Sequence, residues 1–159
     1  MLGVTVIAVG KLKEAYFREA VAEYQKRLAA FCRFQIFELP ESRLPQEPSP
    51  LEIERSLLQE GRVMLSKIPA GAKTVALCIE GKSLSSEDLA ETIQQISREA
   101  PQVCFLIGSS HGLSPQVKQA ADFRISMSAM TFPHQLARVL LCEQLYRAFC
   151  IYTRRKYHK

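Results

Sequence analysis

Short apolar runs alternate with amphipathic segments along this chain of 159 residues. Residues 4–9 form an apolar, largely β-branched run that stops at Gly10, which predicts a buried strand. In residues 13–30, apolar side chains recur at helical spacing between charged ones, which predicts an amphipathic helix. The chain therefore opens with a strand followed by a helix.

The same alternation continues toward the C-terminal end. Further strands are predicted at 34–39, 74–79, 103–107 and 123–127, and further helices at 51–68, at 85–96, from 115 onwards and at 133–152. Two helices carry capping signals, because Ser85 precedes Asp88 by three residues and Ser114 precedes Pro115. This order predicts one α/β domain over residues 1–159, with a mainly parallel sheet of five or six strands, helices on both faces, and ligands at the carboxyl ends of the strands.

The last predicted helix is apolar nearly all round, since Leu136, Leu140, Leu145 and Phe149 do not share one stripe. Such a helix must be covered on both sides. We expect one side to pack on the sheet and the other to meet a second copy of the chain in a two-fold dimer. Burial at the centre of a single chain is the alternative.

Positive charge is concentrated at the C-terminal end. Residues 138–159 hold six Lys or Arg and one acid, Glu143. Their charge of +5 equals the net charge of the whole chain. A localised excess predicts an anionic partner, with nucleic acid as the first candidate, although a solvated basic tail has the same composition. We expect a cytosolic protein without a membrane partner, because no apolar window is long enough to span a bilayer and no secretory leader is visible. The five cysteines form no C-x-x-C pair, which favours reduced core thiols over a metal site or disulfides.

The run Gly108-Ser109-Ser110-His111-Gly112 matches G-x-S-x-G, the pattern of a serine-hydrolase nucleophile loop. Asp122, His134 and His158 follow it in hydrolase order. However, the next helix begins only at Ser114-Pro115, and no glycine-rich oxyanion loop precedes the motif. We therefore favour a loop that approaches a ligand closely, with a plain tight turn as the alternative.

Three late segments, 77–81, 108–112 and 127–132, each follow a predicted strand. If those strands are neighbours, the segments meet in one pocket. Backbone groups there can bind a neutral heterocycle, and Leu77, Met127, Met130 and Phe132 can enclose it.

The late part of the chain resembles the SPOUT methyltransferases that modify pseudouridine in large-subunit ribosomal RNA, and the resemblance covers essentially the full length. It rests on Ile107-Gly108-Ser109-Ser110-His111-Gly112-Leu113, on Ser126-Met127-Ser128-Ala129-Met130-Thr131-Phe132-Pro133-His134-Gln135, on Arg138-Val139, on Glu143-Gln144-Leu145-Tyr146-Arg147-Ala148, on Tyr157-His158-Lys159, and on Ala8-Val9-Gly10-Lys11 and Glu23-Tyr24 near the start.

This resemblance implies a C-terminal trefoil knot, a homodimer, S-adenosylmethionine as methyl donor without a metal, and methylation of N3 of a pseudouridine in 23S ribosomal RNA of the assembled ribosome. No DNA partner is implied. The residues that it implies for cofactor binding are Leu77, Gly108, Met127, Ser128, Ala129, Met130, Thr131 and Phe132. The family usually has glycine where this chain has Ser109, which costs about 1 kcal/mol if that position needs a positive φ.

Methyl transfer to a ring nitrogen requires alignment with the methyl group and loss of the imide proton. Arg138 and Arg154 are candidates to stabilise negative charge on the ring oxygens. His158 and Tyr157 are candidates to take the proton or to stack on a base. A non-catalytic RNA-binding module is the other function that these residues allow.

Overall fold

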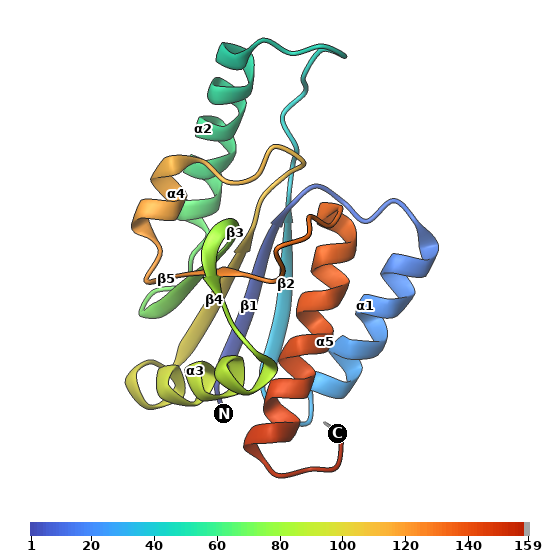
Figure 1. Ribbon diagram of the computed structural model, residues 1–159, viewed down its shortest axis with the longest axis vertical. Coiled ribbons are helices and arrows are strands. Elements are labelled where there is room, and N and C mark those ends of the chain that lie inside the picture. The colour runs from blue at the N-terminus through green and yellow to red at the C-terminus, as the bar shows by residue number, and fades with distance from the viewer. Residues whose placement is uncertain (158–159) are drawn as a thin grey trace.

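A five-stranded sheet forms the centre of the computed structural model, which describes residues 1–157 (Figure 1). All neighbouring strands are parallel, in the order β2-β1-β4-β3-β5, so the predicted parallel α/β fold is confirmed. The strands are β1 (Gly3–Val9), β2 (Arg33–Leu39), β3 (Ala72–Ser83), β4 (Gln102–Ile107) and β5 (Phe123–Ser126), and the helices are α1 (Ala15–Leu28), α2 (Pro50–Ser66), α3 (Ser86–Glu99), α4 (Pro115–Ala120) and α5 (His134–Tyr152).

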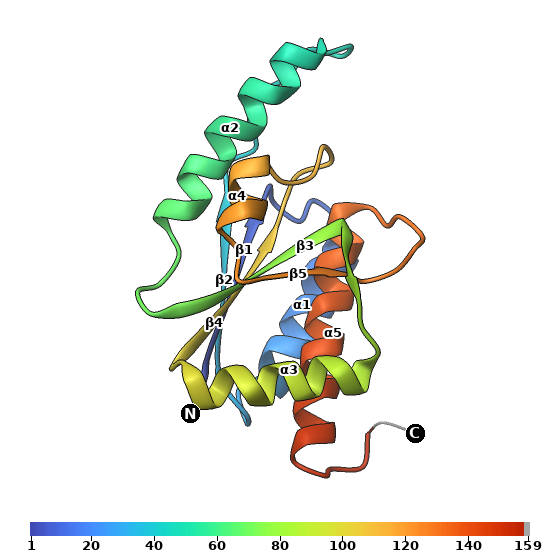
Figure 2. The same cartoon turned by 60° about the vertical axis from the view of Figure 1, so that its left-hand side comes forward.

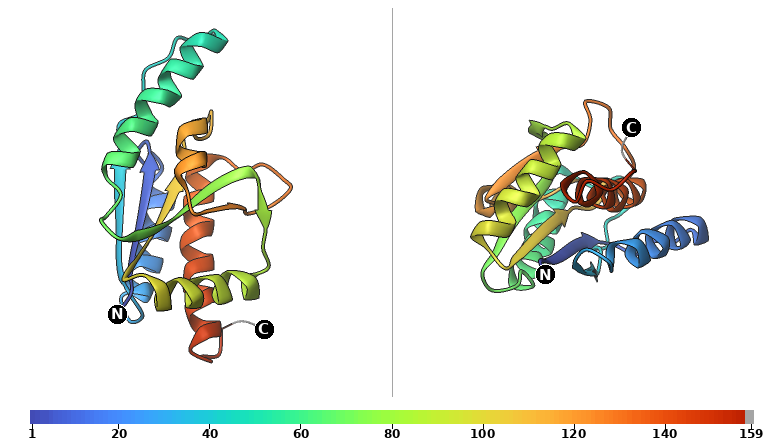
Figure 3. Two further views of the ribbon diagram at one scale, coloured as in Figure 1. Left: turned by 90° about the vertical axis from the view of Figure 1, so that its left-hand side faces the viewer. Right: turned by 90° about the horizontal axis from the view of Figure 1, so that it is seen from below.

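The helices cover the sheet on both faces (Figures 2 and 3). Because side chains alternate along a strand, Val4, Val6 and Ala8 of β1 pack with α1, α3 and α5, whereas Ile7 and Val9 pack with α2 and α4. Every residue of β1 is buried. This explains why β1 reads as a continuous apolar run rather than as an alternating one.

Helix α5 lies between α1 and α3 and packs against both. Leu141, Leu145, Ala148 and Phe149 are buried, and no α5 residue before Tyr152 is exposed. The expectation that a second copy meets the other side of α5 stays a prediction, since Leu136, Val139 and Leu140 are only half-buried within the chain.

The predicted capping signals are confirmed at α3 and α4. The Asp88 N–H donates to the Ser85 hydroxyl and the Ser85 N–H donates to the Asp88 carboxylate, each at 3.0 Å, which closes a capping box. The Ser114 hydroxyl caps α4 in the same way, accepting from the Val117 N–H at 3.2 Å.

The end of β3 was predicted too early, at residue 79. The strand continues to Ser83 because its pairing with β5 is interrupted after Leu77 and resumes at Lys82. At Gly81 this irregular stretch passes so close to the backbone of Ile125 that a Cβ atom has no room. A local pattern does not reveal such an interrupted pairing, since the partner strand lies more than 40 residues away.

At their amino ends, β3 and β5 are joined by Asp122. The backbone N–H and the hydroxyl of Thr74 donate to Asp122 Oδ2 at 2.8 and 2.9 Å, and Lys73 lies 3.6 Å from Oδ1. Burial opposes the charge of Asp122, but the hydrogen bonds from Thr74 and the nearby Lys73 outweigh it and lower the pKa of this carboxyl. The contact therefore stabilises the ionised form.

We predict that Asp122→Asn lowers the free energy of unfolding by about 1 kcal/mol at neutral pH, because the carboxylate is partly exposed and its hydrogen bonds are weakened rather than all lost. A group whose pKa is lowered by folding contributes stability above its unfolded pKa and loses it as the pH falls. The difference from wild type in urea unfolding should thus shrink below roughly pH 4. A difference that stays constant from pH 7 to pH 3 would contradict this account.

Candidate cofactor and substrate site

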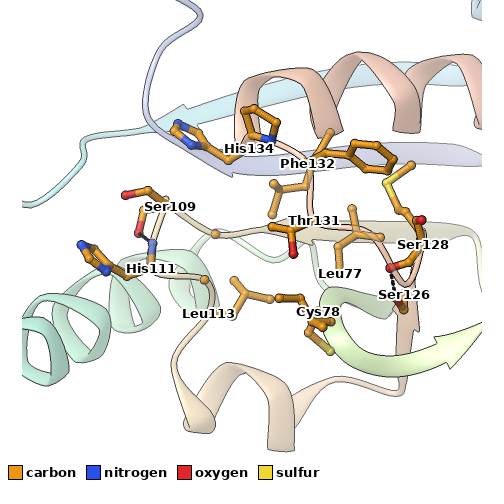
Figure 4. Close-up of a pocket in the computed structure, with 18 of the residues that line it drawn as sticks. Leu77, Cys78, Ser109, His111, Leu113, Ser126, Ser128, Thr131, Phe132 and His134 are labelled. Carbon is orange, nitrogen blue, oxygen red and sulfur yellow. Dashed lines mark hydrogen bonds between the residues drawn. The ribbon is translucent and has the colours of Figure 1, made fainter. Parts of the chain in front are cut away.

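A cavity of about 720 Å³ lies at the carboxyl ends of β3, β4 and β5 (Figure 4). The three predicted segments meet there, so residues distant in sequence form one wall. Of the eight residues implied for cofactor binding, seven line the cavity, and Ala129 does not. The lining includes Leu77, Cys78, Ile79, Glu80, Ile107, Gly108, Ser109, Ser110, His111, Gly112, Leu113, Lys118, Ser126, Met127, Ser128, Met130, Thr131, Phe132, Pro133, His134 and Ala137.

The segment 108–112 folds back on itself as a tight loop. The Gly112 N–H donates to the Ser109 carbonyl at 2.9 Å, and Gly112 has a φ of +83°. A Cβ atom at Gly108 would collide with the Gly112 carbonyl. Ser109 is not in the left-handed region, since Arg154 is the only non-glycine residue there in the described part of the chain. The backbone strain considered for Ser109 therefore does not arise.

The segment after β5 forms the opposite wall and is held by serine hydroxyls. Ser126 donates to the Ser128 carbonyl at 3.0 Å, and the Met130 N–H donates to the Ser128 hydroxyl at 3.0 Å. Met130 is 73% exposed at the edge of the cavity, as is Ile79 of β3 at 70%. These two apolar side chains are suited to contact a flat ring that enters the cavity.

Charged groups are few in this cavity. Lys118 of α4 lies 2.5 Å from Glu80 of β3, and its hydrogen bond lowers the pKa of that carboxyl. His111 and His134 stand on two sides of the cavity (Figure 4). No group of three or more His, Cys, Asp or Glu residues suited to a metal occurs within residues 1–157.

Arg138, predicted as catalytic, does not line the cavity. It is 1% exposed, and its guanidinium donates to Glu38 Oε2 at 2.6 Å and to the Gly10 carbonyl at 2.9 Å. It thereby joins α5 to the carboxyl ends of β1 and β2. Within the described chain, the contacts of Arg138 are therefore with these strand ends and not with the cavity.

The tail residues lie at the far end of α5. Tyr157 packs edge-on against Tyr146 with ring centroids 4.7 Å apart, and its hydroxyl donates to Glu143 at 3.2 Å. Burial, with Tyr24 and Glu143 nearby, raises the pKa of Tyr157 to about 12, so its phenol is neutral at physiological pH. Arg154 is exposed just after the helix with a φ of 56°, and His158 lies outside the described residues.

Helix α5 separates this tail from the cavity of the same chain. His134 lines the cavity, and the 19-residue helix carries Tyr152 about 27 Å away. Tyr157 reaches back along α5 to Glu143, which is nine residues beyond His134. The structure thus brings together the residues implied for cofactor binding, but Arg154 and Tyr157 do not line the cavity of the same chain.

The hydrolase alternative fails on geometry. Ser110 is at the carboxyl end of β4, whereas Asp122 is bound to Thr74 at the amino ends of β3 and β5. An acid at that end of the sheet cannot orient a histidine beside Ser110.

Sequence reasoning also missed residues of the site. Lys118 and Glu80 come from elements 38 residues apart, and no local pattern links them. His134 also lines the cavity. The only sequence feature that could have predicted this is that His134 closely follows the segment 127–132, which forms one wall of the cavity.

Comparison with known proteins identifies the family. A family model described as a predicted SPOUT methyltransferase matches residues 2–158. The chain belongs to the SPOUT methyltransferase family. Members of this family use S-adenosylmethionine as methyl donor, and membership implies a trefoil knot in the fold.

Individual relatives match this chain over its full length. The chain is 44% identical to ribosomal RNA large subunit methyltransferase H of Ligilactobacillus salivarius and 45% identical to the protein of the same name from Bacillus pumilus, in each case over 99% of this chain and 100% of the relative. A probable methylase family protein from Haemophilus influenzae superposes with a TM-score of 0.59 over 100% of this chain and 72% of that chain. Their sequences are only 12% identical, so this likeness supports the fold alone.

We predict that Gly108→Ala weakens binding of S-adenosylmethionine at least tenfold, because the added methyl group forces the 108–112 loop away from its tight turn. Isothermal calorimetry measures the affinity. Gly3→Ala in β1 is the matched control, since its Cβ would meet only the flexible side chain of Gln102. Undiminished binding by a folded Gly108→Ala protein would show that this loop does not hold the cofactor.

Proposed function

We propose that the protein transfers a methyl group from S-adenosylmethionine to N3 of pseudouridine 1915 in 23S ribosomal RNA of the assembled ribosome, and that it acts as a homodimer. The observation that carries the proposal is the full-length identity of 42–45% to several proteins named ribosomal RNA large subunit methyltransferase H. The cavity at the three strand ends supports it. A ribosomal substrate also implies that the protein works in the cytoplasm, and no helix within residues 1–157 has the length and apolarity to cross a membrane.

The cavity is suited to bind the cofactor mainly through shape and backbone. Gly108 allows close approach to the 108–112 backbone, while Leu77 and Phe132 supply apolar walls (Figure 4). We assign cofactor binding to these residues and to 127–131 between β5 and α5. When bound, S-adenosylmethionine supplies a methyl group on a sulfonium, which is a strong leaving group and needs no metal.

The protein must then align the pseudouridine ring and favour loss of its N3 proton. We assign these tasks to the tail. Arg154 stabilises negative charge on the ring oxygens, Tyr157 stacks as a neutral phenol, and His158 accepts the proton as the N–C bond forms. Arg138 contributes indirectly, because it fixes the start of α5 beside the cavity through Glu38 and Gly10.

The length of α5 supports the homodimer. Arg154 and Tyr157 do not line the cavity of their own chain, so we infer that the tail completes a site on a second copy, and a two-fold interface supplies two such sites at once. Half-buried apolar residues on α5, among them Leu136, Val139 and Leu140, remain available to contact the second copy.

Methyl transfer from labelled S-adenosylmethionine to ribosomes that lack the modification tests the proposed function. We expect label in 23S ribosomal RNA, mapped by mass spectrometry to pseudouridine 1915. Binding of ribosomes without any transfer would instead support the alternative of a non-catalytic RNA-binding module.

We predict that deletion of residues 157–159 leaves affinity for S-adenosylmethionine within about twofold and lowers methyl transfer at least a hundredfold, because the tail meets RNA and not the cofactor. Calorimetry and single-turnover transfer to ribosomes measure the two quantities. Arg98→Ala, which removes an exposed charge on α3, is a control for loss of surface charge. Full activity of the truncated protein would place the whole active site in the three loops.

A further inference from the structure

A buried carboxylate lies beneath the cofactor loop. Glu60 of α2 is only 6% exposed. Its Oε2 accepts the Ser42 N–H at 3.0 Å, whereas its Oε1 is buried without a hydrogen-bond partner among the described residues. Buried acids are normally paired. Glu60 has no Lys or Arg within ion-pair distance in the described part of the chain, so its position needs an explanation.

The surroundings of Glu60 partly offset the cost of burial. Burial raises the pKa of this carboxyl, and the charge of Glu41 adds to that effect. The Ser42 N–H, the Ser109 hydroxyl and the nearby His111 lower it. Burial is the largest of these effects, so the pKa of Glu60 lies above its usual range.

Glu60 is close to the cavity because α2 packs directly on the segment that follows β4. A Cβ atom at Gly61 would overlap the Ser114 side chain, so helix and segment are in contact at this point. Ser109 is itself buried and belongs to the 108–112 loop. Figure 4 shows Ser109 and His111 on the side of the cavity nearest α2. One loop therefore separates Glu60 from the cofactor cavity.

We propose that the charge of Glu60 makes this cavity prefer the cationic methyl donor over the neutral thioether product. The inference rests on the proposed function, in which donor and product differ by one methyl group and one positive charge. Loop contacts to the adenosine and amino-acid parts are the same for both ligands. A negative charge in a dry environment is poorly screened and stabilises only the sulfonium.

Glu60 is better placed for this effect than the acid that lines the cavity. Glu80 faces the cavity directly, but Lys118 neutralises it at 2.5 Å. The field of such a pair falls off quickly with distance. Glu60 is not paired in this way, so its field acts across the loop. Release of the product then follows from loss of the sulfonium charge rather than from a change of shape.

Calorimetry with S-adenosylmethionine and S-adenosylhomocysteine tests the proposal on the full-length protein. In Glu60→Gln, which keeps the shape of the side chain, the ratio of the product Kd to the donor Kd should fall about fivefold from its wild-type value. Glu54→Gln, an exposed acid on the same helix, should leave that ratio unchanged. Equal changes in both affinities would show a purely structural role and overturn the proposal.

The pH dependence supplies a second measurement. The wild-type ratio should rise with pH as Glu60 ionises, and the rise should be smaller in Glu60→Gln. His111, His134, Glu41 and the Glu80–Lys118 pair are present in both proteins, so their contributions cancel in the comparison.

Ser109→Gly keeps the proposal testable if Glu60→Gln does not fold. It removes a hydroxyl that lowers the pKa of Glu60, so the rise should move to higher pH. If the ratio rises at the same pH in Ser109→Gly as in wild type, the proposal is overturned. If the wild-type protein methylates ribosomes but these tests give the negative results, only this inference is wrong. If neither the wild type nor any variant methylates ribosomes, the proposed function is wrong.

Discussion

Parallel pairing of β3 with both β4 and β5 is the constraint on which the site depends. It brings the later part of β3 beside the carboxyl ends of β4 and β5, and the chain leaves β4 and β5 in loops instead of entering a helix at once. Two glycines allow these loops to lie close together, since Gly81 touches the β5 backbone and Gly108 touches the Gly112 carbonyl. The cavity is therefore a consequence of backbone packing, and its affinity for a cofactor is set by how closely the chain can approach itself.

The rigidity of α5 is the second constraint. The helix begins at the cavity and ends about 27 Å away, so the positions of its two ends are fixed relative to one another. The buried Arg138 holds its first turns against Gly10 and Glu38. Its later turns are covered by α1 and α3. Because the helix is rigid, Arg154 and Tyr157 beyond its C-terminal end stay outside the cavity of their own chain.

Much of the fold was predictable because its signals are local. The β-branched runs, the Ser85 capping box and the proline after Ser114 each act within a few residues, and the strand-end loops follow from the order of the elements. The role of Arg138 was not predictable, since Glu38 lies 100 residues away in the sequence. The same holds for Glu60, whose neighbours Ser42 and Ser109 come from two other segments. What covers α5 was not predictable either, because an apolar helix has the same pattern whether its own chain or a second copy covers it.

The central claim, that one chain supplies the cofactor cavity and another the tail, is tested most directly by mixing two inactive proteins. One carries Gly108→Ala and an intact tail, and the other carries an intact cavity but lacks residues 157–159. After unfolding and refolding together, mixed dimers should regain roughly a quarter of wild-type methyl transfer to ribosomes, since half of the dimers are mixed and each has one complete site. If each parent is inactive and the mixture remains inactive although mixed dimers are detected by mass spectrometry, cavity and tail must act within one chain and the account is contradicted.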